Sequence, residues 1–390
     1  MAWRGGRVDK AGICCLVFKG SRGFNQFLAR HIIMIMNKFS VVPGIFSLLL
    51  SGAQLTYGQN LLASDEAWTA LNLKVTDELV IPGYQNMAAN SVDLVNAAAN
   101  FCTEISAEGL DSFKAAYHQS MADWQLIQHI QFGPITYFNW NYRLQYWPDE
   151  RGTGARQLDA LIGSGDESVL GSDSFARQSV GVQGLPALER ILFDDNAIEN
   201  FQGNPYLCLV SQTIVRNINE ISSGVTQRWT DEYRAVVLDP VASGFYENAE
   251  DLSIDFLKAL QEAIAKIRDL KLAPVLGDSF ASSRNREAES WRSGRSLANI
   301  KINLLALQPL FLAYTTAFYE EDVAAVQAAF NDLSANLKVL PDTMSAALEN
   351  EEQYGRLRML SGQVDAVHEA LEAALKNTDL YLGFNSLDGD

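Results

Sequence analysis

Histidine and cysteine are scarce in this sequence of 390 residues, which holds four of each. Beyond the first 53 residues the only histidines are His118, His129 and His368, and each stands alone on a stretch with helical periodicity. The sequence has no His-Glu-x-x-His, Gly-x-Ser-x-Gly or Cys-x-x-Cys pattern and no glycine-rich phosphate loop. The usual signatures of zinc peptidases, serine hydrolases, thiol oxidoreductases and nucleotide-binding proteins are therefore missing.

Basic side chains are also few, because 30 Lys and Arg face 47 Asp and Glu and give a net charge of -17. Residues 1–53 hold seven of the basic side chains and a single acid, so the rest of the chain is more acidic still. An acidic surface repels phosphate backbones, which excludes nucleic acid as an expected partner. Such a surface favours cations and basic partners only weakly, because most of the carboxylates are expected on solvated helix faces.

No stretch of the sequence alternates between apolar and polar residues as a strand would. Instead, apolar residues recur at intervals of three and four, most clearly at Leu252, Phe256, Leu260, Ile264 and Ile267. The fold class predicted is all-α, with two packed domains that resemble four-helix bundles. Besides the helix near 250–270, helical periodicity covers the ranges 66–105, 109–131, 205–237, 287–318, 321–349 and 352–378.

Turn-forming residues collect in the segment 132–175, which includes Gly133-Pro134, Trp147-Pro148 and Gly163-Ser164-Gly165. A long connection in an otherwise helical protein is often a binding segment. A second break at 238–247 sets the predicted boundary between an N-terminal domain, 54–240, and a C-terminal bundle, 241–390.

The N-terminal segment indicates export. Met36-Asn-Lys precedes an apolar stretch at 39–50 and the small residues Ser51-Gly52-Ala53, as in a secretory signal cleaved after Ala53 or, alternatively, after Gly58. Since such a signal begins with a short basic region, the biological start is predicted at Met36, and a genuine cytosolic extension is the alternative. About a dozen apolar residues are too few to span a bilayer, so we expect no transmembrane span after cleavage.

Two of the cysteines, Cys102 and Cys208, lie beyond this signal. In an oxidising compartment an even pair favours a disulfide over a metal or catalytic site. We predict a bridge between them, with two buried free thiols as the alternative.

The segment 179–193 combines Gly184 and Pro186 with an apolar-periodic stretch that contains Glu189 and Arg190. Glycine and proline would start or kink a helix there, with Glu189 in its first turn, where the helix dipole stabilises a carboxylate. A purely structural role as the charged start of a helix would account for this pattern.

The same segment resembles the imelysin-like family, whose hallmark is Gly-x-His-x-x-Glu. Further resemblance lies in 124–135, in Tyr146-Trp-Pro-Asp149, in 291–299 and in the ending 383–390, and so extends over nearly the whole exported chain. The resemblance implies two helical bundles with the signature near a cleft between them. It also implies a periplasmic location, soluble or peripheral to the outer membrane, an association with bacterial iron uptake, and a proposed metallopeptidase site.

This sequence departs from that hallmark, since Pro186 stands at the histidine position between Gly184 and Glu189. Proline has no donor atom for a metal, and one carboxylate cannot replace the three or four ligands that zinc requires. No catalytic residue is therefore assigned, and the metal ligands are unknown beyond Glu189. A harder divalent metal or iron held by Glu189 and other oxygen atoms is the cofactor that remains open.

A polar and aromatic set is expected to form a ligand-binding cleft with the signature. On a helix, Arg292, Ser296 and Asn299 would share one face and offer donors to an anion. A polar interface satisfied by its own partners is the alternative. The full predicted set is Glu189, Arg190, Asn139, Arg143, Trp147, Arg292, Ser293, Ser296 and Asn299.

The sequence thus predicts a periplasmic imelysin-like protein that binds a ligand or metal in an interdomain cleft and lacks catalysis. Two alternatives remain. One is an active imelysin-type metallopeptidase that uses other ligands, and the other is an envelope scaffold that docks a basic partner.

Overall fold

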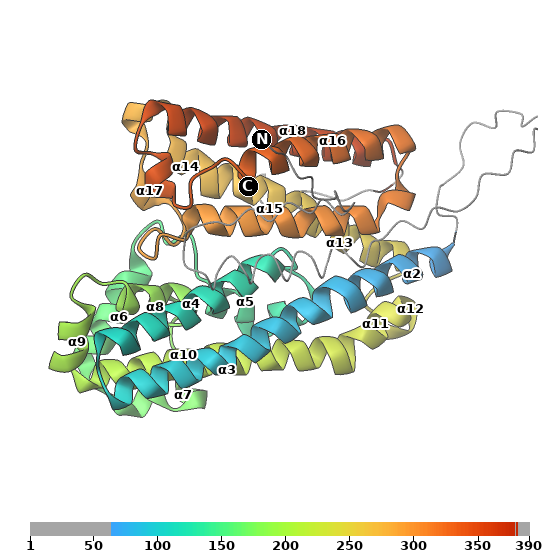
Figure 1. Ribbon diagram of the computed structural model, residues 1–390. Coiled ribbons are helices and arrows are strands. Elements are labelled where there is room, and N and C mark those ends of the chain that lie inside the picture. Colours follow the sequence, from blue (N-terminus) through green and yellow to red (C-terminus); the bar gives the residue numbers. More distant parts are fainter. Residues whose placement is uncertain (1–63, 379, 381–390) are drawn as a thin grey trace, which may run out of the picture. The chain divides into compact units, whose positions relative to one another are not determined.

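The computed structural model describes residues 64–378 and Leu380, and every regular element in this part of the chain is a helix (Figure 1). The predicted all-α fold class is confirmed. The predicted signal at 1–53, the start at Met36 and the ending 383–390 lie outside the described residues.

The first group of helices is built around one long helix, α3, which packs against the helices on either side of it. Polar caps begin several of these helices, because Ser64, Ser106 and Asn204 each accept a hydrogen bond from a backbone N–H of the first turn. The helices of this group are α2 (Asp65–Val75), α3 (Ile81–Thr103), α4 (Ala107–Ile127), α10 (Pro205–Arg228) and α11 (Arg234–Leu238).

Two of the long helices are continuous through a π-helical turn. Residues 76–80 join α2 to α3, and residues 229–233 join α10 to α11. For this reason the unbroken periodicity of 66–105 and 205–237 is found as two long helical rods, as predicted.

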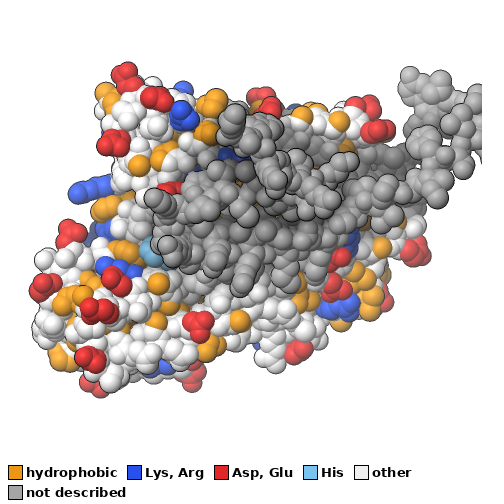
Figure 2. Space-filling view, viewed as in Figure 1, with side chains coloured by type: hydrophobic (Ala, Val, Ile, Leu, Met, Phe, Trp, Pro, Cys, Tyr) orange, Lys and Arg blue, Asp and Glu red, His pale blue; other side chains and the backbone are white. Residues whose placement is uncertain are grey.

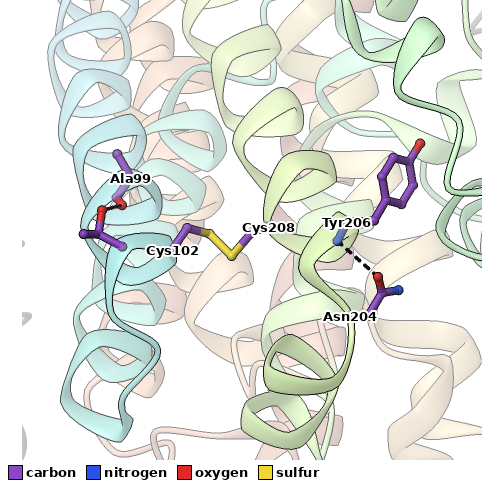
Figure 3. The surroundings of a disulfide bond; sticks show 6 residues. Ala99, Cys102, Asn204, Tyr206 and Cys208 are labelled. Atoms are coloured by element: carbon purple, nitrogen blue, oxygen red, sulfur yellow. Dashed lines mark hydrogen bonds between the residues drawn. A yellow bond between two sulfur atoms is a disulfide. The ribbon is translucent and has the colours of Figure 1, made fainter.

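A disulfide ties α3 to α10 (Figure 3). Cys102 near the end of α3 and Cys208 near the start of α10 have Cα atoms 5.7 Å apart and are separated by 106 residues in sequence. Since cross-links that close long loops restrict the unfolded chain most, the bridge stabilises this pair of helices.

Between α4 and α10 the chain runs through short helices, as the turn signals predict. These are α5 (Trp140–Leu144), α6 (Thr153–Ser164), α7 (Ser172–Ala176), α8 (Gly184–Leu192) and α9 (Ala197–Gly203), with 3-10 turns at Gly133–Asn139, Glu167–Leu170 and Val180–Val182.

The second group of helices follows a short α12 (Pro240–Ser243) and carries the clearest amphipathic helix. In that helix Leu252, Phe256, Leu260 and Ile264 are fully buried, as their spacing predicts. The group contains α13 (Ala249–Lys266), α14 (Ala273–Leu276), α15 (Ser296–Ala313), α16 (Glu320–Leu337), α17 (Met344–Ala347) and α18 (Glu351–Lys376), with a π-helical stretch at Ile267–Leu272 after α13 and 3-10 turns at Phe280–Ser282, Asn285–Glu287 and Thr315–Ala317.

One helix in the described part of the chain, α15, is long and apolar enough to cross a membrane, with a mean hydropathy of 1.3. Two-thirds of this helix (67%) is buried among its neighbours, including α4 and α13. Its apolar character is accounted for by its position inside the helical packing.

Two of the predicted helices are shorter than their periodicity suggested. The helix expected at 287–318 begins only at Ser296, because residues 290–295 form a turn in which Ser290 and Gly294 have φ values of 51° and 68°. The helix expected at 321–349 ends at Leu337, shortly before Pro341.

Buried polar contacts join the two groups of helices. The side chain of Asn72 on α2 donates to the carbonyl of Ala249 (2.9 Å) and accepts from Ser253 (2.8 Å) and from Tyr314 (2.6 Å). The helices α13 and α15 both pack against α2. The division into domains at residues 240–241 stays a prediction.

Candidate functional site

The signature segment forms the start of α8, where Gly184 has a φ of +71°. A Cβ atom at this position would lie 2.3 Å from the carbonyl oxygens of Arg143 and Leu144. Only glycine fits so close to another backbone segment. The family's glycine is therefore required by packing here, independently of any ligand.

Glu189 lies in the second turn of α8, so its predicted place in the first turn was wrong: the helix begins at Gly184 rather than after Pro186. Its side chain is buried, with 6% exposed. One carboxylate oxygen, Oε1, accepts hydrogen bonds from the backbone N–H (2.8 Å) and the hydroxyl (2.7 Å) of Ser293. Glu189 thus fastens the turn at 290–295 to α8.

Burial raises the pKa of Glu189, while the hydrogen bonds from Ser293 and the positive charge of Arg292 oppose this rise. The negative form of a buried carboxylate needs such donors. The carboxylate of Glu189 is therefore held by the protein's own groups.

Next to this carboxylate is a cavity of about 290 Å³, which we call the arginine cavity because Arg190, Arg286 and Arg292 line it. The guanidinium of Arg292 lies over the ring of Trp291, 4.3 Å from its centre, and that of Arg286 lies 5.3 Å from the same ring. Residues of both groups of helices form the walls, since 146–150 and 180–190 come from the first and 270–292 from the second. Figure 2 shows basic side chains near one edge of the molecule, between acidic ones that are scattered over the visible face.

The charges in the arginine cavity are only partly compensated. Arg190 lies 3.9 Å from Asp149, whose carboxylate also accepts from the backbone N–H groups of Thr153 and Gly154. Burial lowers the pKa of Arg292, and the positive charges of the nearby Arg190 and Arg286 lower it further. The negative charge of Glu189 opposes this fall. An anion placed among these guanidinium groups would relieve their mutual repulsion.

The structure brings part of the predicted set together. Glu189, Arg190, Trp147 and Arg292 line the arginine cavity, as does Pro186, and Ser293 contacts Glu189. Arg292 lies in the turn before α15, so it does not share a helix face with Ser296 and Asn299.

Four other predicted residues lie outside the arginine cavity. Arg143 is buried and donates to Gln183 (2.9 Å) and Asn217 (2.6 Å), and Asn139 is an exposed residue that precedes α5. Ser296 is buried at the start of α15, and Asn299 donates to Glu289 at 3.0 Å. None of these four is among the residues that line the arginine cavity.

Sequence reasoning missed a buried ion pair between Lys271 and Glu289, whose side chains are each 2% exposed. The ammonium of Lys271 also donates to Gln125 (2.9 Å) and Asn303 (2.7 Å). A signal existed: Lys271 falls four residues after Ile267, on the apolar stripe of α13 and its π-helical extension.

A second cavity of about 470 Å³ shares two lining residues, Trp147 and Leu270, with the arginine cavity. We call it the lysine cavity, because Lys266 and Lys271 line it. Its wall also carries His129, two tryptophans and several amide side chains.

Together these features define an all-helical protein with paired cavities between two groups of helices. The chain belongs to the imelysin family: the model described as Imelysin (Peptidase M75) matches residues 80–373, which confirms the resemblance noted in the sequence. No curated protein matches the chain.

Two solved structures share the fold. An imelysin-like protein from Psychrobacter arcticum is 19% identical, with a TM-score of 0.67 over 82% of this chain and 98% of that one. A protein from Parabacteroides distasonis, described as an iron-regulated protein A precursor, is 15% identical, with a TM-score of 0.62 over 83% of this chain and 97% of that one.

The side chains around Glu189 do not fit a metal centre. Pro186 offers no donor atom, Glu189 accepts from Ser293, and Glu289 accepts from Lys271 and Asn299. Nowhere in residues 64–378 do three His, Cys, Asp or Glu side chains come together in a group suited to a metal ion. Zinc needs three or four such ligands, so no metal-dependent step is derived for this site.

Proposed function

We propose that this imelysin-family protein binds a small polyanion in the arginine cavity, without catalysis, and serves iron uptake from the bacterial periplasm. The observation that carries the proposal is the cluster of Arg190, Arg286 and Arg292 on the wall of one cavity. Guanidinium groups with an aromatic ring beside them are suited to carboxylates and other anions.

The chemistry of the signature supports binding rather than hydrolysis. A metallopeptidase activates water on a metal ion. Of the positions that would supply ligands to that ion, one holds Pro186 and the other holds Glu189, whose carboxylate accepts hydrogen bonds from Ser293. In the proposed function Glu189 positions the turn that carries Arg292 and does not itself take part in a reaction.

Two observations support the biological setting. One relative in fold is described as an iron-regulated protein A precursor, and residues 36–53 have the pattern of a secretory signal. Anionic chelators are a chemically reasonable cargo for a cationic cavity in such a protein, because their carboxylates bind both iron and guanidinium groups.

The proposal is tested by titrating the purified protein with citrate and with ferric citrate in a calorimeter. Replacing Arg292 with methionine keeps an apolar stem over Trp291 and removes the charge, so binding should weaken at least tenfold. Arg356→Met on α18 is the matched control, because the side chain of Arg356 is 37% exposed and its ion pair within residues 64–378 is with the exposed Glu352.

Equal binding by the Arg292 variant and the control would contradict the proposal. So would stoichiometric metal in protein purified without chelators, together with peptide cleavage that is lost in Glu189→Ala.

A further inference from the structure

The lysine cavity holds a cation whose compensation by the protein is incomplete. Lys266 ends α13 and lines the cavity, yet its ammonium forms no hydrogen bond or ion pair with any residue in the described part of the chain. Lys271 differs, because Glu289 lies 2.9 Å from it. Glu262, the acid on the cavity wall, lies 3.9 Å from Lys258.

A second polar side chain in this wall, that of His129, also has no hydrogen-bonding partner among the described residues. His129 follows the end of α4, and its imidazole makes no hydrogen bond within residues 64–378. Burial lowers its pKa to about 4, so the ring is neutral at pH 7 and presents one N–H donor. Burial likewise lowers the pKa of Lys266, and the negative charges of Glu289 and Glu262 oppose this fall.

The rest of the wall is suited to a flat apolar body. Trp124 and Trp147 supply aromatic surface, and Ile267, Leu270 and Leu307 supply aliphatic surface. The volume of about 470 Å³ falls in the range of small-molecule sites. A largely buried ammonium that no carboxylate contacts directly is costly, and a bound carboxylate would offset that cost.

We propose that the lysine cavity is a second binding site, distinct from the arginine cavity, for a small aromatic monocarboxylate. Its carboxylate pairs with Lys266 and accepts from His129, and its ring lies against Trp147. One negative charge matches the one ammonium of this wall that has no direct ion pair, in contrast to the three arginines of the neighbouring cavity.

The test uses indole-3-acetate and its neutral isostere indole-3-acetamide in calorimetric titrations of the full chain. We expect one equivalent of the acid to bind at least tenfold more tightly than the amide. In Lys266→Met this preference should vanish, and in Lys266→Arg most of it should remain. Lys338→Met is the matched control, because Lys338 is exposed at the end of α16.

A third variant separates the two cavities. Arg292→Met, which weakens anion binding in the arginine cavity, should leave the affinity for indole-3-acetate unchanged. The proposal is overturned if neither indole compound binds, if both bind equally, if Lys266→Met keeps the preference for the acid, or if Arg292→Met removes it.

A stability measurement gives an independent check. Since Lys266→Met removes a poorly solvated charge, the variant without ligand should melt at the same temperature as the parent or higher. A marked drop in melting temperature would mean that the protein itself satisfies this ammonium, and would also overturn the proposal.

Discussion

The ammonium of Lys271 and the carboxylate of Glu289 lie 2.9 Å apart in the interior, and the pair is hydrogen-bonded to four amide side chains, those of Gln125, Gln145, Asn299 and Asn303. Gln125 comes from α4, and Asn299 and Asn303 come from α15. The pair therefore joins the two groups of helices, and its Lys271 lines the lysine cavity. Burial lowers the pKa of Lys271 to about 8, and the negative charge of Glu289 opposes this fall.

Breaking this pair from one side should destabilise the protein strongly. Lys271→Met leaves the Glu289 carboxylate buried without its cation, which typically costs about 3–5 kcal/mol in free energy of unfolding. Urea denaturation followed by circular dichroism measures the change. The double variant Lys271→Met with Glu289→Gln should lose clearly less than the two single changes added together.

The matched control is the exposed pair of Arg356 and Glu352 on α18, where Arg356→Met should cost less than about 1 kcal/mol. Equal effects of the buried and exposed changes would show that the interior pair contributes little.

Gly184 and Gly362 should respond in opposite directions to alanine. At Gly184 a methyl group would meet two backbone oxygens at 2.3 Å with φ at +71°, so we expect a loss of more than about 2 kcal/mol. Gly362 lies in the middle of α18 with nothing near its Cβ position, so alanine there should stabilise by about 0.5–1 kcal/mol. Thermal and urea unfolding of both variants check this.

If Gly184→Ala unfolds at the same urea concentration as the parent, the close approach of α8 to residues 143–144 is not a constraint. The glycine of the signature would then have to be explained by a ligand.

Asp123 should make stability depend on pH. Its side chain is buried and accepts from Asn90 (2.8 Å) and Gln119 (3.0 Å), and burial raises its pKa to about 7. Because this folded-state pKa lies above the value of 3.8 expected for the unfolded chain, the folded state binds the extra proton. The contribution of Asp123 to stability is therefore present at low pH and is lost as the pH rises from about 4 to 7.

Asp123→Asn removes this titration. The stability of the parent relative to the variant should fall between pH 4.5 and pH 8, by on the order of 3 kcal/mol. The control is Asp173→Asn, at an exposed position in α7. A difference between parent and Asp123→Asn that stays constant over this pH range would show that Asp123 is ionised throughout.

Helical periodicity was sufficient to predict the long helices, because each buries one continuous apolar stripe against a neighbour. It failed at 287–295, where the residues before α15 continue the mixed pattern of the helix. Only the positive φ of Ser290 and Gly294, which the sequence does not display, breaks the chain into a turn. For that reason Arg292, which lies in this turn, does not share the expected helix face with Ser296 and Asn299.

Only part of the site could be predicted, because local sequence patterns mark some of its residues and not the contacts between distant ones. Glu189, Arg190 and Trp147 were found because the signature and the irregular segment mark them. The bond from Ser293 to Glu189 joins residues 104 apart in sequence, and such tertiary pairings have no local pattern. Arg143 was assigned to the cleft by its charge, whereas its buried partners Gln183 and Asn217 fix it in the interior.

Restoring the family histidine with Pro186→His should not by itself create a metal centre. The new imidazole would lie three residues before Glu189 on α8, on the same side of the helix. It would raise the number of side-chain ligands to two at most, while the carboxylate of Glu189 still accepts hydrogen bonds from Ser293. Zinc retained after gel filtration, measured by metal analysis, should therefore stay well below one equivalent, as in the parent. The variant Pro186→Gln is the control for loss of the proline ring. One tightly held equivalent of zinc in Pro186→His alone would mean that further ligands reorient around the histidine, and that proline at this position is what separates the protein from a metal-binding relative.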